Sequence, residues 1–248
     1  MFQSLRYLAL LAGFTAFLGA AAAPGHAVTK SKVVIELFTS QGCSSCPPAD
    51  KLVGELAERR DVIALTFPVD YWDYLGWKDT LASPAYSMRQ RAYARARGDG
   101  QVYTPQIVVD GKAHVVGSHA SAVKNAILKS ANQNTVGVSL TMHSEGDSII
   151  IKAGAAPEGM RVKPATIWLA LVKKSAAVKI ERGENRGSTI TYHRVVKLMS
   201  PVGQWTGEKV TIKLPKNHLQ STDSDGCTVL LQQDHAGPIL AAAEMKSW

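Results

Sequence analysis

The chain has 248 residues, 46% of them hydrophobic, and its 28 basic and 20 acidic side chains give a formal net charge of +8. This length suits either two modest domains or one larger domain. The positive charge is moderate and spread along the chain, and no nucleic-acid-binding motif is present, so we expect no nucleic-acid partner.

The N-terminal segment has the pattern of an export signal. Arg6 precedes an uncharged apolar stretch over residues 7–23, which small residues follow at positions 24–27. We expect residues 1–27 to be a signal peptide cleaved after Ala27, and the mature protein to be periplasmic or secreted. The alternative is an uncleaved anchor, because the apolar stretch almost reaches a membrane-spanning length. Only that alternative predicts contact with a membrane.

Cys43 and Cys46 form a C-x-x-C motif between a predicted strand over residues 33–38 and a predicted helix over residues 49–60. The free N–H groups and the positive dipole end at a helix N-terminus stabilise a thiolate. We therefore expect Cys43 to be the attacking sulfur, and Cys46 to resolve a mixed disulfide by displacing the partner. An exported chain also meets an oxidising environment, in which such a pair can close.

The same cysteine spacing has two other uses. Cys43 and Cys46 could share a zinc ion with His114 and His119, or they could form a permanently closed structural disulfide. The third cysteine, Cys227, begins a predicted strand, and we expect it to be a buried apolar side chain rather than a further redox thiol.

A second buried strand is predicted over residues 62–67, and an aromatic loop over residues 70–77 follows it. This loop is either a hydrophobic plug over the domain or a lip that contacts a substrate chain. Ser83 and Pro84 predict the start of a helix that runs to residue 97. Tyr86, Arg89, Tyr93 and Arg97 lie near one face of that helix. We expect this face to be a packed aromatic stripe with solvated arginine head groups rather than a binding site.

Thr104 and Pro105 stand directly before a predicted hairpin over residues 106–116, whose turn is Asp110-Gly111. A cis peptide bond at Pro105 would present the backbone of Thr104 beside the cysteine pair. A last helix of this part is predicted over residues 119–130.

From residue 135 onward the pattern changes to about seven short strands, which predicts a sandwich-like β-rich part. We place the boundary near residues 131–135, with one domain over residues 28–132 and a second over residues 133–248. The polar loop over residues 182–187 either pairs its charges locally, which we expect, or carries a binding role.

Residues 32–130 resemble a thioredoxin-like α/β domain with a helical insertion between its halves. More narrowly, the sequence over residues 36–50, 70–73 and 103–106 resembles a secreted bacterial family of thioredoxin-like proteins of unassigned function. The resemblance covers the mature chain and implies a fold, export and a dithiol, but no substrate.

The chain departs from ordinary thioredoxins in having Ser44-Ser45 between the cysteines and no tryptophan before Cys43. Glu36 lies one residue away from the register of the buried aspartate that assists proton transfer in thioredoxins. It is therefore either a proton acceptor or a carboxylate that faces water at the strand end.

These features predict an exported thiol–disulfide oxidoreductase that acts on cysteine-containing envelope proteins, is recycled by an unidentified redox partner and needs no cofactor. Cys43 attacks, Cys46 resolves, and Thr104 and Pro105 align the partner chain. The alternative is a noncatalytic binding module that holds a protein partner, or copper(I) between the two thiolates.

Overall fold

The structure is a computed structural model, and it describes residues 32–133, 137–219 and 223–247. The expected signal segment and part of the expected domain boundary lie outside these ranges. Within them, no helix is both long and apolar enough to cross a membrane.

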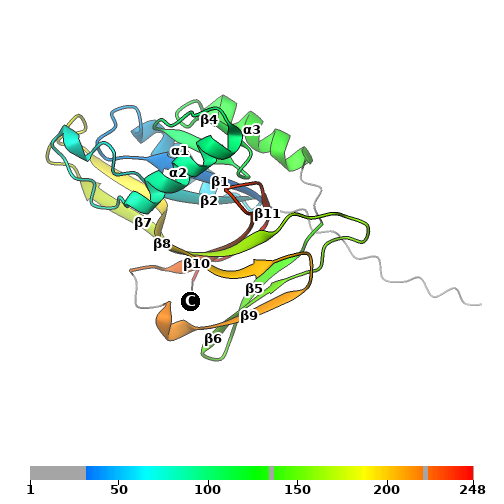
Figure 1. The fold of residues 1–248 in the computed structure, drawn as a ribbon. Coiled ribbons are helices and arrows are strands. Elements are labelled where there is room, and N and C mark those ends of the chain that lie inside the picture. The colour runs from blue at the N-terminus through cyan, green and yellow to red at the C-terminus, as the bar shows by residue number, and fades with distance from the viewer. Residues whose placement is uncertain (1–31, 134–136, 220–222, 248) are drawn as a thin grey trace, which may run out of the picture.

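The centre of the fold is an eight-stranded sheet with the strand order β11-β10-β7-β8-β2-β1-β3-β4 (Figure 1). Strands β1 and β2 are buried along their whole length because helices or other strands cover both faces of the sheet. The eight strands are β1 Val33–Thr39, β2 Val62–Pro68, β3 Gln106–Val109, β4 Ala113–Val116, β7 Ala165–Lys179, β8 Thr189–Trp205, β10 Gly226–Gln233 and β11 Ile239–Met245.

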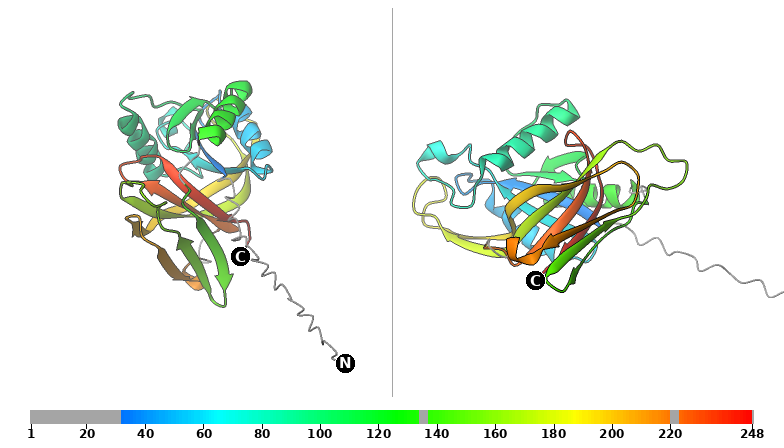
Figure 2. Two further views of the ribbon diagram at one scale, coloured as in Figure 1. Left: turned by 90° about the vertical axis from the view of Figure 1, so that its right-hand side faces the viewer. Right: turned by 60° about the horizontal axis from the view of Figure 1, so that its bottom comes forward.

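Helices cover both faces of the N-terminal part of this sheet. Strands β1 and β2 are parallel, and the crossover between them is helix α1 (Pro47–Ala57). Helices α1 and α3 (Ala120–Gln133) pack on one face, while α2 (Pro84–Arg97) packs on the other (Figure 2). Because side chains alternate along a strand, Ile35 and Leu37 meet α1, whereas Val34 and Phe38 meet the side chains of α2.

Several helices and strands end at the capping and turn residues that the sequence predicted. The Ser83 hydroxyl accepts a hydrogen bond from the Ala85 N–H group at the start of α2, and Gly98 ends that helix with φ +75°. In the β3–β4 connection, Asp110 and Gly111 both have positive φ, and the Lys112 N–H group donates to the Val109 carbonyl at 2.9 Å. Val109 pairs with Ala113, so the connection is one residue longer than the two-residue turn that we expected.

Strand β8 joins the two halves of the chain. It lies parallel to β2, with Thr66 opposite Val195, and the Thr66 hydroxyl donates to the His193 carbonyl at 2.7 Å. A single sheet therefore contains strands from both sides of the domain boundary that we expected near residues 131–135.

The β-rich part contains a second sheet of three strands, β5 (Leu140–Glu145), β6 (Ser148–Ala153) and β9 (Val210–Pro215), in the order β5-β6-β9. Its apolar face packs on β7, β10 and β11, so this half consists of two facing sheets around a shared core. Two short 3-10 helices, η1 (Asp73–Leu75) and η2 (Lys216–His218), complete the described elements.

Strands β7 and β8 are much longer than expected and form an antiparallel hairpin that extends beyond the rest of the sheet. We call residues 180–188, at the end of this hairpin, the hairpin tip. The hairpin tip lies beside the loop of η1, as Figure 1 shows, and a Cβ added at Gly183 would lie 3.4 Å from the Trp77 Cβ.

Candidate functional site

Cys43 and Cys46 are joined by a disulfide at the N-terminus of α1, with their Cα atoms 5.4 Å apart. Cys46 is the N-cap residue, and its carbonyl accepts from Ala49 and Asp50. The first turn of the helix thus begins at the second cysteine, as the motif predicted. Cys46 is fully buried and Cys43 is 3% exposed, whereas Ser44 and Ser45 are exposed between them. Cys43 is therefore the cysteine nearer to solvent.

The loop before the cysteines is held by side chains from the aromatic loop over residues 70–77 and by Asp79, which follows it. The Gln41 N–H group donates to Asp79 at 2.8 Å, and the Gln41 side chain accepts from the Trp77 indole N–H at 2.8 Å. Trp72 packs against Gly42, where an added Cβ would lie 3.1 Å from the Trp72 Cβ. Both indoles are half-buried, but Tyr74 is 77% exposed. The segment therefore buttresses the site and also presents one aromatic ring to solvent.

Thr104 and Pro105 lie beside the cysteine loop, and the peptide bond between them is cis, as expected. The Thr104 hydroxyl accepts from the Trp72 indole N–H at 2.8 Å, and Trp72 in turn contacts Gly42. On the other side, a Cβ at Gly117 would lie 3.3 Å from Pro105 and 3.1 Å from Ala49 of α1. These contacts place the proline next to the first turn of the helix that carries Cys46.

The hairpin tip contacts the cysteine loop directly, which corrects the expectation of local charge pairing over residues 182–187. The Asn185 side chain donates to the carbonyls of Gln41 and Cys43, both at 2.9 Å. Glu184 accepts a hydrogen bond from the Ser44 N–H group at 3.2 Å. The contacts join residues about 140 positions apart, so no local pattern in the sequence could have indicated them.

Asp50 is a buried carboxyl group on α1, one helical turn after Cys46. Neither of its oxygens has a hydrogen-bond partner among the residues that the structure describes. Burial raises the pKa of Asp50 to about 8, the nearby Thr39 hydroxyl lowers it, and the charge of Asp79 raises it further. Asp50 is therefore mostly protonated at pH 7 and can exchange a proton near neutral pH.

Asp79 and Tyr192 lie close enough to Asp50 to interact with it electrostatically. Burial raises the pKa of Asp79 to about 6, although the N–H groups of Gln41 and Leu81 donate to its carboxylate and oppose that shift. Burial also raises the pKa of Tyr192, on β8, and the charges of Asp50 and Asp79 add to that effect. We call Asp50, Asp79 and Tyr192 the acidic cluster. Perturbed carboxyl groups next to a reactive pair are typical of functional sites.

Asp50 was not among the site residues predicted from the sequence, although the sequence contains a signal for it. Asp50 lies four residues after Cys46, and three and seven residues before the buried Val53 and Ala57. It therefore belongs to the inward-facing stripe of α1, where a carboxyl group is unusual.

The structure places Glu36 away from the cysteines, which corrects both roles proposed for it. Glu36 is fully buried on the α2 side of the sheet, whereas α1 packs on the opposite side. It forms an ion pair with Arg89 Nε at 2.8 Å and accepts a short hydrogen bond from Tyr93. Glu36 therefore neither lies beside the dithiol nor faces water, and Arg89 is not a solvated head group.

Cys227 is fully buried on β10, in the core between the two sheets, as expected. Its thiol lies 3.5 Å from the Met142 sulfur, and burial raises its pKa to about 12. A thiol in this state is a poor nucleophile, because the thiolate is the reactive form.

The histidines considered for a zinc site have other surroundings. His114 Nδ1 is hydrogen-bonded to the Tyr103 hydroxyl at 2.8 Å, and its Nε2 lies 3.2 Å from Asp99. Within the part of the chain that the structure describes, no three side chains of the metal-binding types gather in one place.

Together, the fold and the site define a mixed α/β protein with one large sheet and a cysteine pair at the start of a helix. Residues 34–232 match the model of a family described as "Protein of unknown function (DUF1223)". The match covers more than half of the chain, and the protein therefore belongs to this family.

Several solved structures are similar to the chain. A crystal structure of a protein from Agrobacterium tumefaciens is 33% identical, with a TM-score of 0.76, and the similarity covers 88% of this chain and 95% of the other. HBP35 of Porphyromonas gingivalis is 13% identical, with a TM-score of 0.59 and coverage of 88% and 76% of the two chains, so it indicates a shared fold alone. No match was found among curated proteins.

Proposed function

We propose that the protein is an exported thiol–disulfide oxidoreductase with a thioredoxin-like fold, and that Cys43 exchanges disulfides with cysteines of other proteins. The observation that carries this proposal is the Cys43–Cys46 disulfide at the N-terminus of α1, with Cys43 nearer to solvent and Asp50 buried one turn beyond Cys46. The strand order β2-β1-β3-β4, with α1 and α3 on one face and α2 on the other, supports the thioredoxin-like assignment.

The exchange proceeds in two steps. The Cys43 thiolate attacks one sulfur of a partner disulfide, which forms a mixed disulfide and releases the first partner thiolate. Cys46 then loses its proton and attacks the Cys43 sulfur, which closes the Cys43–Cys46 bond and releases the second partner thiolate. Two electrons pass to the partner. The same steps in reverse oxidise a partner dithiol, and the reduction potentials of the two pairs set the direction.

Asp50 has a role in the proton transfer of this scheme. When Cys46 leaves or attacks, it must gain or lose a proton in a buried setting. The Asp50 carboxyl lies on the same face of α1, one turn away, and its pKa of about 8 suits both directions of transfer near neutral pH. Thr104 and Pro105 are proposed to align the partner chain, since they lie at the edge of the cysteine loop and next to α1.

The proposal is tested by trapping the mixed disulfide in the mature protein. Cys46→Ser removes the resolving thiol, so this variant should accumulate a mixed disulfide at Cys43 with a cystine-containing peptide, visible by mass spectrometry. Cys43→Ser should form far less adduct, because its remaining thiol is fully buried. Equal adduct formation by both variants, or by neither, would contradict the assignment of Cys43 as the nucleophile.

One further measurement distinguishes disulfide exchange from the alternative function of copper(I) binding. Two thiolates at this spacing bind soft metals, so the reduced protein should be compared with and without copper(I) by native mass spectrometry. Stoichiometric copper retention together with no exchange in glutathione buffers would favour a binding module over an oxidoreductase.

A further inference from the structure

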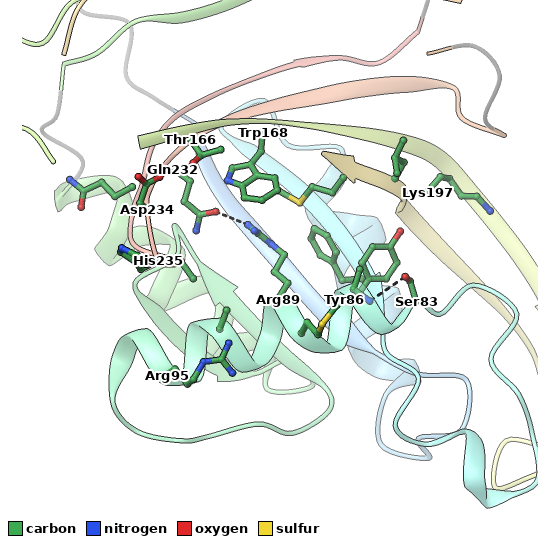
Figure 3. Close-up of a pocket in the computed structure, with 18 residues that line it drawn as sticks. Ser83, Tyr86, Arg89, Arg95, Thr166, Trp168, Lys197, Gln232, Asp234 and His235 are labelled. Carbon is green, nitrogen blue, oxygen red and sulfur yellow. Dashed lines mark hydrogen bonds between the residues drawn. The ribbon is translucent and has the colours of Figure 1, made fainter. Parts of the chain in front are cut away.

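A cavity of about 530 Å³ lies between α2 and the strands of the β-rich half, on the α2 side of the large sheet (Figure 3). Its walls come from α2, from β7 and β8, and from the turn between β10 and β11. The cysteine pair belongs to α1 on the opposite face, so this cavity is separate from the candidate site. Its volume falls within the range of about 300–1,000 Å³ that is usual for small-molecule sites.

One part of the cavity is apolar. Tyr86 of α2 and Trp168 of β7 both line it (Figure 3), and Met199 of β8 is a further lining residue. At its rim, Met88 is 61% exposed and Leu198 is 45% exposed. Large apolar side chains that line a cavity and remain open to water favour an apolar ligand group over an empty site.

Positive charge predominates in the lining. Arg89, Arg95 and Lys197 line the cavity, and Asp234 is the single acidic side chain among the described lining residues. The Asp234 carboxylate accepts a hydrogen bond from the Thr166 hydroxyl at 2.7 Å. Glu36 is paired with Arg89 and Asp223 lies 4.0 Å from Lys197, so among the described residues Arg95 is the lining cation that can favour an anionic ligand group.

The three cations differ in their availability. Arg89 is paired with Glu36 at 2.8 Å and lies 5.0–6.0 Å from the ring centres of Phe67, Tyr93 and Trp168, so it forms a fixed part of the wall. Lys197 lies 4.0 Å from Asp223. Arg95 is exposed on α2, nearer the end of the cavity formed by the β10–β11 turn, whereas Lys197 lies at the other end (Figure 3).

The β10–β11 turn forms the end of the cavity near Arg95, and its backbone conformation is fixed by hydrogen bonds. His235 and Ala236 both adopt left-handed backbone conformations, with φ of +61° and +56°. The Gln232 side chain donates to the Gly237 carbonyl at 2.9 Å, and Gly237 N–H donates to the Gln233 carbonyl at 3.1 Å, so the turn is held in place. Strained backbone that is held by neighbouring bonds often occurs at binding sites.

We propose that this cavity binds a small carboxylate ligand with an apolar body. The apolar body lies between Tyr86, Trp168 and Met199, and the carboxylate is directed to Arg95 at the end formed by the β10–β11 turn. Binding does not depend on the redox state of the cysteines, because they lie on the other face of the sheet.

The experiment uses decanoate as the probe and decanol as its uncharged match, with the mature protein and isothermal titration calorimetry as the measurement. Decanoate should bind with one-to-one stoichiometry. Arg95→Gln should weaken decanoate binding about threefold to fivefold, as expected for the loss of one partly exposed ion pair, and should leave decanol binding unchanged. Lys152→Gln, an exposed lysine on β6 in the second sheet, serves as the matched control and should change neither affinity.

A second variant tests the place of binding without removing a charge. Ala92→Trp fills the cavity from α2 and should abolish binding of both probes, while circular dichroism verifies that the variant is folded. If Ala92→Trp fails to fold, Trp168→Ala, which removes one wall of the cavity, should weaken binding of both probes, and unchanged binding by a folded Trp168→Ala variant would overturn the proposal. Absence of saturable decanoate binding, equal binding of the two probes, or full binding by a folded Ala92→Trp variant would each overturn the proposal.

Discussion

Asp50 and Glu36 are both fully buried carboxyl groups, but their surroundings give them different chemistry. Glu36 has a guanidinium at 2.8 Å and serves as a structural ion-pair partner. Asp50 has no cation partner among the described residues, and burial raises its pKa. Its proton is therefore available for exchange, whereas Glu36 stabilises the contact between the sheet and α2.

Asp50→Asn should make the protein more stable at high pH. The folded-state pKa of Asp50 is raised from 3.8 to about 8, so wild-type folding carries a penalty that is absent below about pH 4, grows as the pH rises, and is complete above pH 8. Each pK unit corresponds to about 1.4 kcal/mol, so the variant should gain up to several kcal/mol at pH 8.5 relative to pH 4.

Urea unfolding of the oxidised protein at pH 4, 6 and 8.5 measures this difference. Asp147→Asn, at an exposed carboxylate in the β5–β6 turn, should show no comparable trend. Parallel pH profiles for wild type and Asp50→Asn would refute the assignment of the raised pKa to Asp50. In the proposed function the same variant should also slow disulfide exchange near neutral pH.

The two cysteine thiols of the reduced protein should react at different rates. Cys43 is nearer to solvent and lies at the positive end of α1, so iodoacetamide should label it before Cys46, with a pKa somewhere within about 3.5 to 7.5. Peptide mapping after short pulses at several pH values gives the two rates. Equal rates that follow an ordinary thiol pKa would show that the helix does not activate Cys43.

At the scale of elements, the hairpin tip controls how the cysteine loop is held. Asn185 satisfies the carbonyls of Gln41 and Cys43, and Glu184 satisfies the Ser44 N–H group. A loop fixed in this way keeps Cys43 in one orientation relative to α1. The tip therefore acts on the cysteine pair by positioning it, although it contributes no reactive group.

Asn185→Ala should loosen this loop. Two carbonyls lose their donor, which should reduce stability by about 1–3 kcal/mol and speed the reduction of the disulfide by dithiothreitol. Urea unfolding and thiol-release kinetics measure the two effects. Asn132→Ala, at an exposed position on α3, is the matched control. Unchanged reduction kinetics in a destabilised Asn185→Ala variant would mean that the tip supports the fold without affecting the sulfur atoms.

Helix α1 also meets β8 at a close contact. A Cβ at Gly54 would lie 2.7 Å from the ring of His193. Gly54→Ala should therefore destabilise the protein, although alanine is the better helix former by about 1 kcal/mol. The double variant Gly54→Ala/His193→Ala should recover much of the loss, because the clash is removed. Thermal unfolding of the four proteins tests this, and additive effects would contradict a direct contact.

At the scale of the whole molecule, the two halves share a core as well as a sheet. On the α2 side, Val34 and Phe67 pack in one cluster with Val196 of β8 and Leu230 of β10. A fragment of residues 28–132 would expose this surface and the free edge of β2. We therefore expect the fragment to lack a cooperative urea transition by circular dichroism, whereas a chain of residues 28–248 should have a single one. A cooperatively folded fragment would show that the first half is self-sufficient.

The features that could be predicted from the sequence depend on local patterns. The strand before Cys43, the helix after Cys46, the Ser83 cap and the Asp110-Gly111 turn each follow from a few adjacent residues. The seven strands after residue 135 were also expected, because alternation and turn residues mark them. Three features depend on long-range packing and were missed: the burial of Glu36 against Arg89, the contact of Asn185 with the cysteine loop, and the pairing of β2 with β8.

The tip of the β7–β8 hairpin contacts the cysteine loop, and this contact restricts the lengths that β7 and β8 can have. A strand advances by about 3.3 Å per residue, so removing two residues from each strand would withdraw the tip by about 7 Å. That displacement exceeds any hydrogen-bond distance and would separate Asn185 from the carbonyl of Cys43. Insertions and deletions between residues 173 and 195 should therefore disturb the cysteine loop, although hairpins at a protein surface usually tolerate such changes. The lengths of β7 and β8 therefore determine whether Asn185 reaches the cysteine loop.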